Sequence, residues 1–407
     1  MNQKLKIFYV YYDFLNIMPI HAHEVIIQLA KNGGSIYLFG SINSNAAITK
    51  KWQSLDICLI PVLSIPLRLL REISFLSKLF CKLSFFSIKI KPDLIYIRHG
   101  SPSLIGTIIG KLFKIPVCIE VNDILVKRNE SKEINFIKRS WVILFEKLSF
   151  LMADMIFPVT DGIKVWICNN YKVDETAVRT LSNGVNVNRF QAGNIVASRR
   201  RYDIPINARV VGYLGSLFHW AGIEYLIDAA PKIISVCPET LFVVGGGGEP
   251  YHSILLKKVY DRGLSSYFKF FGFINWDDAS DFISTFDISV IPAFFNNLES
   301  GISSQKVLAY LACGKPVVGS DIPGLGDMLE REGVGISFPM GDSAALAKGI
   351  LTLLSDSDRR KHMGKEARKL VVNKCSWEII VDRMERYFTE IITKCNRKSS
   401  WQQLRHP

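Results

Sequence analysis

The chain alternates between short apolar runs and longer segments with helical spacing along almost its whole length. Such alternation indicates repeated βαβ units, and therefore parallel sheets with helices on both faces. The sequence predicts an α/β protein with two doubly wound domains. Five strand-like runs come before residue 191 and six follow residue 205: KIFYVYY, GSIYLFG, DLIYIRH, PVCIEVN and MIFPVT, then RVVGYLGS, LFVVGGGG, FKFFGF, ISVIPA, PVVGS and GISF.

A polar and basic stretch, QAGNIVASRRRYDIP, separates the two halves. It shows no clear apolar period, and 407 residues are too many for one ordinary core. Ligands of doubly wound sheets collect outside the carboxyl ends of the strands, so we expect a ligand cleft between the two domains. The expected organisation is a first domain over 1–193, a second over 194–376, a closing helix over 377–398 that packs back toward the first domain, and a frayed tail over 399–407.

Charge and cysteine usage restrict the partners and the compartment. The net charge of +13 favours anionic partners, and on their own these counts do not choose among nucleic acid, an anionic membrane and phosphorylated substrates. The eight cysteines form no CxxC pair, which suggests neither a zinc site nor a disulfide framework. We expect a cytoplasmic protein.

One segment suggests contact with a membrane. The chain has no run of 18 uncharged apolar residues and begins without the pattern of a signal peptide. Residues 61–91, however, combine six Lys or Arg with many Leu, Ile and Phe. Such a segment can lie on the inner, anionic face of a membrane, and a core-packed helix with a basic edge is an equally good interpretation.

Several common motifs are absent. No GxGxxG follows a strand, which weighs against a nicotinamide or flavin site, and no GxxxxGK[ST] indicates a P-loop. HEVII resembles the start of a zinc-protease helix, but Ile27 occupies the position of the second histidine. We therefore expect no metal site. His21 and His23 lie near the start of the first helix, and each alone is most simply a loop histidine.

Small residues follow strands in the second half. Gly215 and Ser216 come directly after one run, and residues 245–248 are four glycines after another. Ser303 and Ser304 begin a helix with no acidic residue in its first turn, an arrangement that favours an anion. Together these features predict a pocket for a phosphorylated, nucleotide-like ligand.

Polar residues also follow the strands of the first half. Each of them can be a simple loop cap, but groups that converge on one cleft suit acceptor binding and proton transfer. They are Arg98, His99, Glu120, Asn122, Asp123, Thr160 and Asp161.

Taken together, these segments resemble the family 4 retaining glycosyltransferases, which have two Rossmann-like domains in the GT-B fold. KPDLIYIRHGSPSLIG, ADMIFPVTDGIKVWI, LSNGVNVNRF, VVGYLGSLFHWAGIEYLIDAA and SSQKVLAYLACGKPVVGSDIPG carry the resemblance, in the family's order and spacing. It implies a nucleotide-diphosphate sugar as donor in the second domain, an acceptor in the first, and no tightly bound cofactor or metal. Carried over to this chain, the catalytic candidates are Glu120, Asn122 and Glu299, and the donor-binding candidates are Gly215, Ser216, His219, Gly246, Gly247, Ser303, Ser304 and Lys306.

The chain departs from the family pattern at two motifs. The family usually has two glutamates eight positions apart, where this chain has Gly301 and Ala309, with Glu299 close by. A basic residue usually precedes the glycine of WAG, where this chain has Ala221. A glutamate at position 309 would bind a nucleotide ribose, unless that position packs against the following strand.

We interpret the chain as a hexosyl-type glycosyltransferase that acts with retention on a glycan or lipid-linked acceptor in surface polysaccharide biosynthesis. It would be peripheral to an anionic membrane and would not bind nucleic acid. The alternatives are a non-catalytic protein that binds sugar nucleotides or glycans on the same fold and, less favoured, a sugar-nucleotide epimerase.

Overall fold

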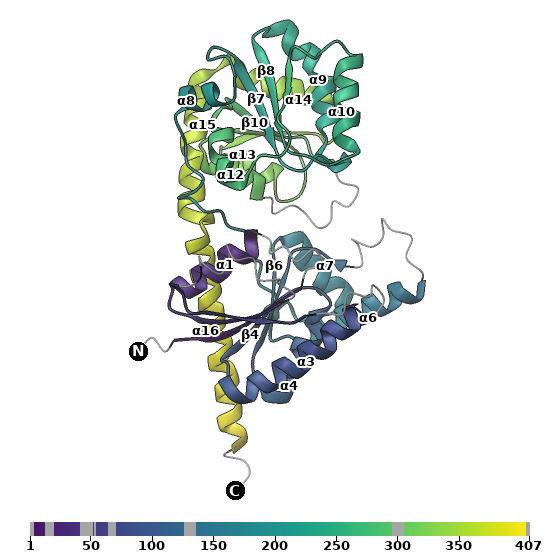
Figure 1. Ribbon diagram of the computed structural model, residues 1–407, viewed down its shortest axis with the longest axis vertical. Coiled ribbons are helices and arrows are strands. Elements are labelled where there is room, and N and C mark those ends of the chain that lie inside the picture. Colours follow the sequence, from purple (N-terminus) through teal and green to yellow (C-terminus); the bar gives the residue numbers. More distant parts are fainter. Residues whose placement is uncertain are drawn as a thin grey trace. The chain divides into compact units, whose positions relative to one another are not determined.

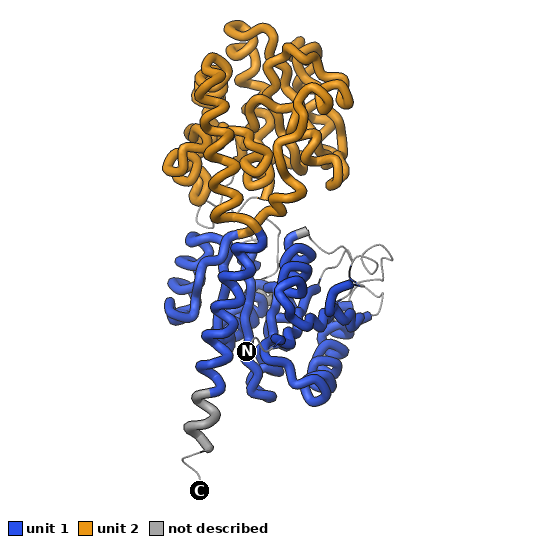
Figure 2. The backbone as a smooth tube through the Cα atoms, turned by 90° about the vertical axis from the view of Figure 1, so that its left-hand side faces the viewer, with its two compact units in different colours: residues 1–182, 377–407 blue, residues 183–376 orange. Residues whose placement is uncertain are grey.

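The structure is a computed structural model that describes residues 4–12, 20–40, 52, 54–63, 71–125, 136–294 and 305–403. The chain divides into two compact units (Figure 2). The first unit joins Met1–Ser182 to Trp377–Pro407, and the second unit is Asn183–Ser376. The second unit thus begins at residue 183, earlier in the chain than the expected start at 194.

The first unit contains a parallel sheet of six strands in the order β3-β2-β1-β4-β5-β6 (Figure 1). We predicted five of these strands and missed β3. That strand is only partly buried, lies at the edge of the sheet and ends at a proline, so it lacks the continuous apolar run of the buried strands. The strands are β1 (Lys6–Tyr11), β2 (Ser35–Gly40), β3 (Ile57–Pro61), β4 (Leu94–Arg98), β5 (Val117–Val121) and β6 (Met155–Pro158).

Helices cover both faces of this sheet. One face packs against α1 and α16 through residues such as Val25, Leu29 and Phe388. The other face packs against α3, α4, α6 and α7 through residues such as Leu79 and Phe150. The helices are α1 (Ile20–Lys31), α3 (Arg71–Ile90), α4 (Pro102–Phe113), α6 (Phe136–Met152), α7 (Asp161–Tyr171) and α16 (Trp377–Gln403).

The second unit contains another parallel six-stranded sheet, in the order β12-β11-β10-β7-β8-β9. All six strands coincide with the predicted apolar runs, because they are short, largely buried and bounded by glycine or proline. The expected α/β class with two doubly wound sheets is therefore confirmed. The strands are β7 (Arg209–Leu214), β8 (Thr240–Gly245), β9 (Phe268–Phe270), β10 (Ile288–Ile291), β11 (Val317–Ser320) and β12 (Gly335–Phe338).

The helices of the second unit surround one continuous core. Helix α9 and helix α14 pack against each other, and α12 packs against α15. The helices are α8 (Ile195–Arg201), α9 (Ile223–Val236), α10 (Tyr251–Asp261), α11 (Ala279–Ser284), α12 (Gln305–Ala312), α13 (Gly326–Arg331), α14 (Ser343–Ser355) and α15 (Ser357–Leu370).

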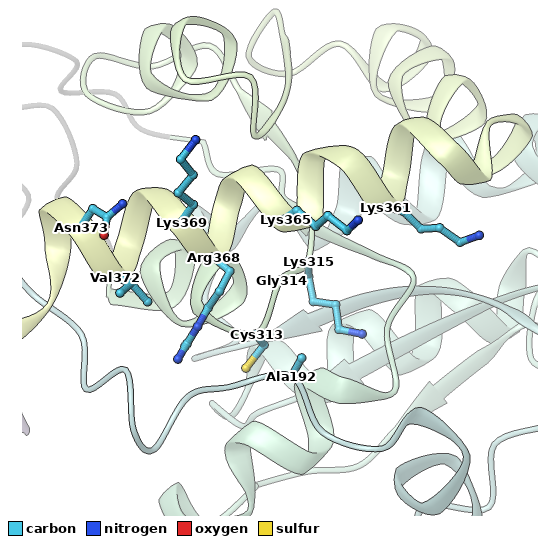
Figure 3. Close-up of a pocket in the computed structure, with 11 residues that line it drawn as sticks. Ala192, Cys313, Gly314, Lys315, Lys361, Lys365, Arg368, Lys369, Val372 and Asn373 are labelled. Atoms are coloured by element: carbon cyan, nitrogen blue, oxygen red, sulfur yellow. The ribbon is translucent and has the colours of Figure 1, made fainter.

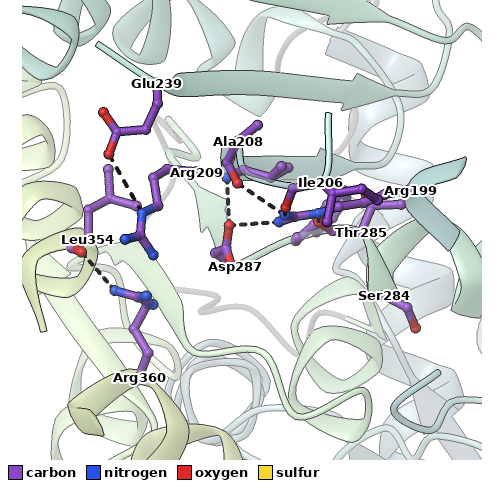
Figure 4. Close-up of polar contacts among 12 residues, drawn as sticks. Arg199, Ile206, Ala208, Arg209, Glu239, Ser284, Thr285, Asp287, Leu354 and Arg360 are labelled. Atoms are coloured by element: carbon purple, nitrogen blue, oxygen red, sulfur yellow. Dashed lines mark hydrogen bonds and ion pairs between the residues drawn. The ribbon is translucent and has the colours of Figure 1, made fainter. Parts of the chain in front are cut away.

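Arg199 fastens α8 to the sheet of the second unit (Figure 4). The side chain is 4% exposed and pairs with Asp287 at 2.8 Å. It also donates to the carbonyls of Thr285, Ile206 and Ala208, at 3.1, 2.6 and 3.1 Å. The segment that looked like a linker in the sequence is thus an integral part of this unit.

Candidate functional site

Two glycine loops lie side by side at the carboxyl edge of the second unit's sheet. The Gly215 amide donates to the Gly245 carbonyl at 3.0 Å, and the Leu217 amide donates to the Gly247 carbonyl at 3.0 Å. A Cβ on Gly246, whose φ is +130°, would lie 1.8 Å from the Gly215 carbonyl oxygen. Only glycine allows this approach of the two backbones.

The same contacts determine which amides remain for a ligand. The amides of Gly215 and Gly246 already donate to carbonyls, the latter to Gly272 at 2.6 Å, so neither is free to bind an anion. The space beside Gly247, by contrast, is open, because a Cβ built on this residue would meet no atom within 4 Å. The two loops are therefore closely packed at Gly215 and Gly246, and they leave space for a ligand at Gly247.

Lys306, in the first turn of α12, lies over the end of β7. Its Nζ donates to the Tyr213 hydroxyl at 3.0 Å and lies 5.1 Å from the centre of that ring. A Cβ on Gly215 would come within 2.4 Å of the Lys306 Cδ, so the lysine stem passes directly over this glycine. The structure therefore brings Lys306, Gly215 and Ser216 together, with the Ser216 carbonyl accepting from the Tyr213 hydroxyl at 2.9 Å.

Helix α12 is fixed in place by Tyr310, one turn further along. Its hydroxyl accepts from the Leu214 amide at 2.7 Å and donates to the Leu214 carbonyl at 2.8 Å. The start of α12 is thus held at the carboxyl end of β7, where a positive helix end and an amine face the same edge of the sheet.

The loop after Ser216 carries exposed aromatic residues. Phe218 and Trp220 stack at 4.5 Å and are 37% and 47% exposed. His219 is exposed between them in sequence, with its ring 6.1 Å from that of Phe294. The Phe294 amide donates to the Trp220 carbonyl at 2.9 Å, which brings His219 to the end of β10.

Of the three positions that depart from the family pattern, Gly301 lies outside the described residues and the other two are in the core. Ala221 is 3% exposed and Ala309 is 5% exposed. The burial of Ala309 favours the interpretation that it packs against its neighbours. Three candidates, Glu299, Ser303 and Ser304, lie outside the described residues.

Glu120 is the centre of a buried cluster in the first unit. It is 3% exposed at the end of β5. One carboxylate oxygen accepts from His21 Nε2 at 2.6 Å and from the Asn122 amide, and the other accepts from the Tyr96 hydroxyl at 2.5 Å. The structure therefore joins the candidates Glu120 and Asn122 to one another, and adds His21 and Tyr96 to them.

The surroundings of Glu120 keep it ionised. Burial alone would raise its pKa, but the charge and hydrogen bond of His21, the nearby Arg98 and the Tyr96 hydroxyl lower the pKa to about 2. With an ionised partner, His21 Nε2 must carry the proton. His21 Nδ1 and Arg98 Nη1 are buried and have no hydrogen-bond partner within the described part of the chain.

Other polar residues at the strand ends have structural roles. His99 pairs with Glu146 at 2.8 Å, and both side chains are almost fully buried. Thr160 caps α7 by accepting from the Ile163 amide at 3.2 Å. Asp161 accepts from the Thr180 hydroxyl at 2.6 Å. These contacts match the loop-cap alternative that the sequence left open for such residues.

Three tyrosines and one histidine are additions that the sequence alone did not identify. Tyr96, Tyr213 and Tyr310 lie within apolar strands or helices. In such a setting the sequence indicates only that an aromatic residue is part of the core. The sequence alone suggests that His21 is most simply a loop residue. Its position near the start of the first helix is the one available clue, since the carboxyl ends of parallel strands meet at the same edge of a sheet.

A second opening lies at the amino edge of the second unit's sheet. This cavity of about 730 Å³ is lined by Cys313, Lys315 and residues of α15 (Figure 3). Burial lowers the pKa of Lys315 to about 8, and its amine donates to the Ser284 and Phe286 carbonyls at 3.0 and 2.7 Å. None of the predicted site residues that the structure describes lines it, and Lys315 is engaged in holding the start of β10.

Among the described residues, no helix combines the length and apolar character needed to cross a bilayer. No group of three or more His, Cys, Asp or Glu side chains in the same part of the chain is placed to hold a metal ion.

Comparison with known proteins identifies two family models along the chain. The model "Glycosyltransferase Family 4" matches residues 18–189. The model "Glycosyl transferases group 1" matches residues 195–370. Between them they span most of both units.

Curated relatives and solved structures agree with these matches. An uncharacterized glycosyltransferase of Methanocaldococcus jannaschii, MJ1607, is 25% identical over 71% of this chain and 73% of its own length. The capsular polysaccharide biosynthesis glycosyltransferase CapM of Staphylococcus aureus is 24% identical over 81% of this chain and 85% of its own. The structure of Anabaena HepE in complex with UDP superposes with a TM-score of 0.76 at 18% identity, covering 95% of this chain and all of that one, which shows the shared fold.

Proposed function

The chain belongs to the family 4 glycosyltransferases, and we propose that it transfers a hexosyl group, with retention, from a nucleotide-diphosphate sugar to a glycan or lipid-linked acceptor. The observation that carries the donor half of this proposal is Lys306 above Gly215 at the carboxyl end of β7. An amine and a helix start together suit a diphosphate. HepE, which shares the fold, was solved with UDP and with UDP-glucose.

The donor would lie along the edge formed by β7, β8 and α12. Lys306 would contact the diphosphate, Ser216 and the open position at Gly247 would line it, and His219 would approach from the loop after β7. Ser303, Ser304 and Glu299 remain candidates from the sequence for the same ligand. No resident metal or cofactor takes part in this proposal.

In the first unit, Glu120 suits a positioning role better than that of a base. A carboxyl group with a pKa of about 2 that already accepts three hydrogen bonds is a weak proton acceptor. Glu120 would instead orient His21 and Asn122 toward the acceptor. A substrate hydroxyl that reaches His21 Nδ1 would complete the hydrogen bonding of that ring.

The biological setting is proposed from two observations. CapM, which this chain matches over most of its length, is named for capsular polysaccharide biosynthesis. This name supports a role of the present chain in surface polysaccharide formation. The exposed basic and apolar side chains of the first unit support its association with an anionic membrane. The acceptor would then be a glycan carried on a lipid.

A test is to incubate the purified protein with a panel of sugar nucleotides and lipid-linked acceptors, and to analyse the product anomer by NMR. We expect transfer from one donor with the anomeric configuration retained. An inverted product would refute retention, and neither transfer nor donor hydrolysis across the panel would refute the transferase proposal.

A second candidate function is a non-catalytic protein that binds sugar nucleotides. The buried Ala309 favours it, because that helix position offers no carboxylate to a ribose. Calorimetry separates the two functions. A binder would take up the sugar nucleotide with one heat of binding and no turnover, whereas an enzyme would also release the nucleoside diphosphate.

A further inference from the structure

Helix α6 carries an apolar stripe on its solvent side. Trp141, Leu144, Phe145, Leu148 and Leu151 recur every three or four positions and therefore share one face of the helix. Trp141 and Leu151 are 53% and 50% exposed, and the rings of Trp141 and Phe145 lie 5.5 Å apart. The stripe is a contiguous hydrophobic surface in contact with solvent, which monomeric soluble proteins rarely present.

The opposite face of α6 packs against the core. Phe150 is buried against the sheet, and Glu146 is buried beside it. The Glu146 carboxylate accepts from His99 at 2.8 Å, from the Tyr171 hydroxyl at 2.6 Å and from the Leu125 amide at 3.0 Å. Rotating α6 to hide the stripe would break these buried bonds, so the stripe is held outward.

Two neighbouring helices extend the apolar surface. Helix α4 packs against both α3 and α6 in the layer that covers this face of the sheet (Figure 1). Helix α3 exposes Phe85 and Ile88, at 60% and 66%, and α4 exposes Leu112 at 64%. Hydrophobic side chains thus emerge from three of the four helices that cover this face of the sheet.

The charge of α3, α4 and α6 is almost entirely positive. Glu72 and Glu146 are the acidic residues of the three helices, and Glu146 is buried in the network above. Basic side chains that reach solvent include Lys78, Lys89, Lys111, Arg139 and Lys147. The surface of these three helices therefore complements an anionic surface. Two copies of it facing one another would repel each other, because both are positively charged.

We infer that α6 docks on an anionic lipid bilayer, with the helix parallel to the surface and the stripe from Trp141 to Leu151 among the acyl chains. Apolar side chains on one face with basic residues around them are the features that bind a helix in the interface. The inference rests on the proposed membrane association, and it does not depend on the transfer reaction.

This location differs from the segment over 61–91, for which the sequence left membrane contact and a core-packed helix as equally good interpretations. Within α3, Lys78 donates to the Leu63 carbonyl at 3.0 Å, and Lys82 donates to the Pro61 carbonyl. These two amines thus bind backbone carbonyls at and just after the end of β3. In this structure α6, rather than α3, carries the continuous stripe.

Vesicle binding by full-length variants tests the inference. The triple variant Trp141→Gln, Leu144→Gln, Phe145→Gln should lower partition onto phosphatidylglycerol vesicles at least about tenfold, because three apolar side chains no longer enter the bilayer. The control variant Ile254→Gln, Leu256→Gln, Tyr260→Gln changes exposed apolar residues of α10 in the second unit and should bind as the parent does.

Insertion of α6 into the bilayer can be measured separately, by fluorescence quenching. Brominated acyl chains should quench Trp141 fluorescence in the parent, and Trp141→Phe should bind vesicles normally while losing that part of the quenching. Equal partition of the α6 variant and the parent would refute the docking site. Dimerisation of the parent through α6, without vesicle binding, would refute the lipid as its occupant.

The transfer reaction is measured separately on a water-soluble acceptor. If the α6 variant loses vesicle binding and keeps this activity, the docking inference is supported independently of catalysis. A parent that binds vesicles through α6 but transfers no sugar would overturn the proposed reaction and leave the docking site intact.

Discussion

The hydroxyl of Tyr310 accepts a hydrogen bond from the Leu214 amide and donates another to the Leu214 carbonyl, at 2.7 and 2.8 Å. One side chain of α12 thereby hydrogen-bonds both backbone groups of Leu214, the last residue of β7. The position of Lys306, one helical turn earlier, depends on this contact. The donor-binding edge is therefore organised by a residue that would not itself contact the donor.

Tyr310→Phe should cost roughly 1–3 kcal/mol of unfolding free energy, since the partly buried Leu214 amide loses its acceptor. It should also weaken binding of UDP, because the start of α12 is less well fixed. Urea unfolding and UDP titration measure the two effects. The control Tyr260→Phe, at a 76% exposed position of α10, should leave both values unchanged.

Lys306→Ala should weaken the binding of nucleoside diphosphates at least about tenfold without unfolding the protein, because a charge-assisted hydrogen bond is lost. Titration with UDP and ADP measures the change. Tyr213→Phe serves as the companion variant, since it removes the hydroxyl that holds the amine and keeps the charge. Parental affinity in Lys306→Ala would exclude Lys306 from the site.

Ala309→Glu should lower the melting temperature and should not tighten UDP binding. The alanine is 5% exposed in the core of the second unit, and a glutamate there would bury an unpaired charge at a cost of several kcal/mol. Thermal melting with and without UDP measures both effects. A variant that melts as the parent does and gains stability with UDP would restore the ribose-binding interpretation of this position.

The first unit should lose stability as the pH falls from about 4.5 to about 2. Glu120 is more acidic in the folded state than its ordinary value of 4.5, so between these pH values the unfolded chain binds more protons and folding becomes less favourable. Above 4.5 the contribution is fully present and amounts to roughly 3 kcal/mol. Urea unfolding at a series of pH values measures it.

Glu120→Gln should flatten this pH profile, whereas Glu175→Gln, at an exposed carboxylate, should preserve it. A Glu120→Gln profile as steep as that of the parent would assign the acid sensitivity to other groups.

Arg199→Met should destabilise the second unit by roughly 3–5 kcal/mol, because it leaves Asp287 without its partner and removes donors from three carbonyls. Arg201→Met is the matched control two residues away. That side chain is half exposed, with its partners Asp278 and Asp281 near the surface, so its loss should matter little. Chemical unfolding of both variants provides the comparison.

The sequence predicted the strands well because burial on both faces leaves an unbroken apolar run. The edge strand Ile57–Pro61 was missed because it is half exposed. Glu120 and Asn122 could be identified from their place after a strand, but His21 and Tyr96 could not, since their contacts with Glu120 span 99 and 24 residues. The engagement of the Gly215 and Gly246 amides with carbonyls was equally out of reach, because it depends on how two loops lie against each other.

Because the first unit is divided between both ends of the chain, the two units cannot complete their folding at the same stage of synthesis. One face of its sheet is covered by α1 together with α16, including Trp377, Met384 and Phe388. A ribosome releases these residues only after the whole second unit, whose own core is continuous in sequence from Val185 to Val371. The second unit can therefore fold during translation, while the nascent first unit keeps an uncovered apolar face until synthesis ends and is the part that needs protection by chaperones.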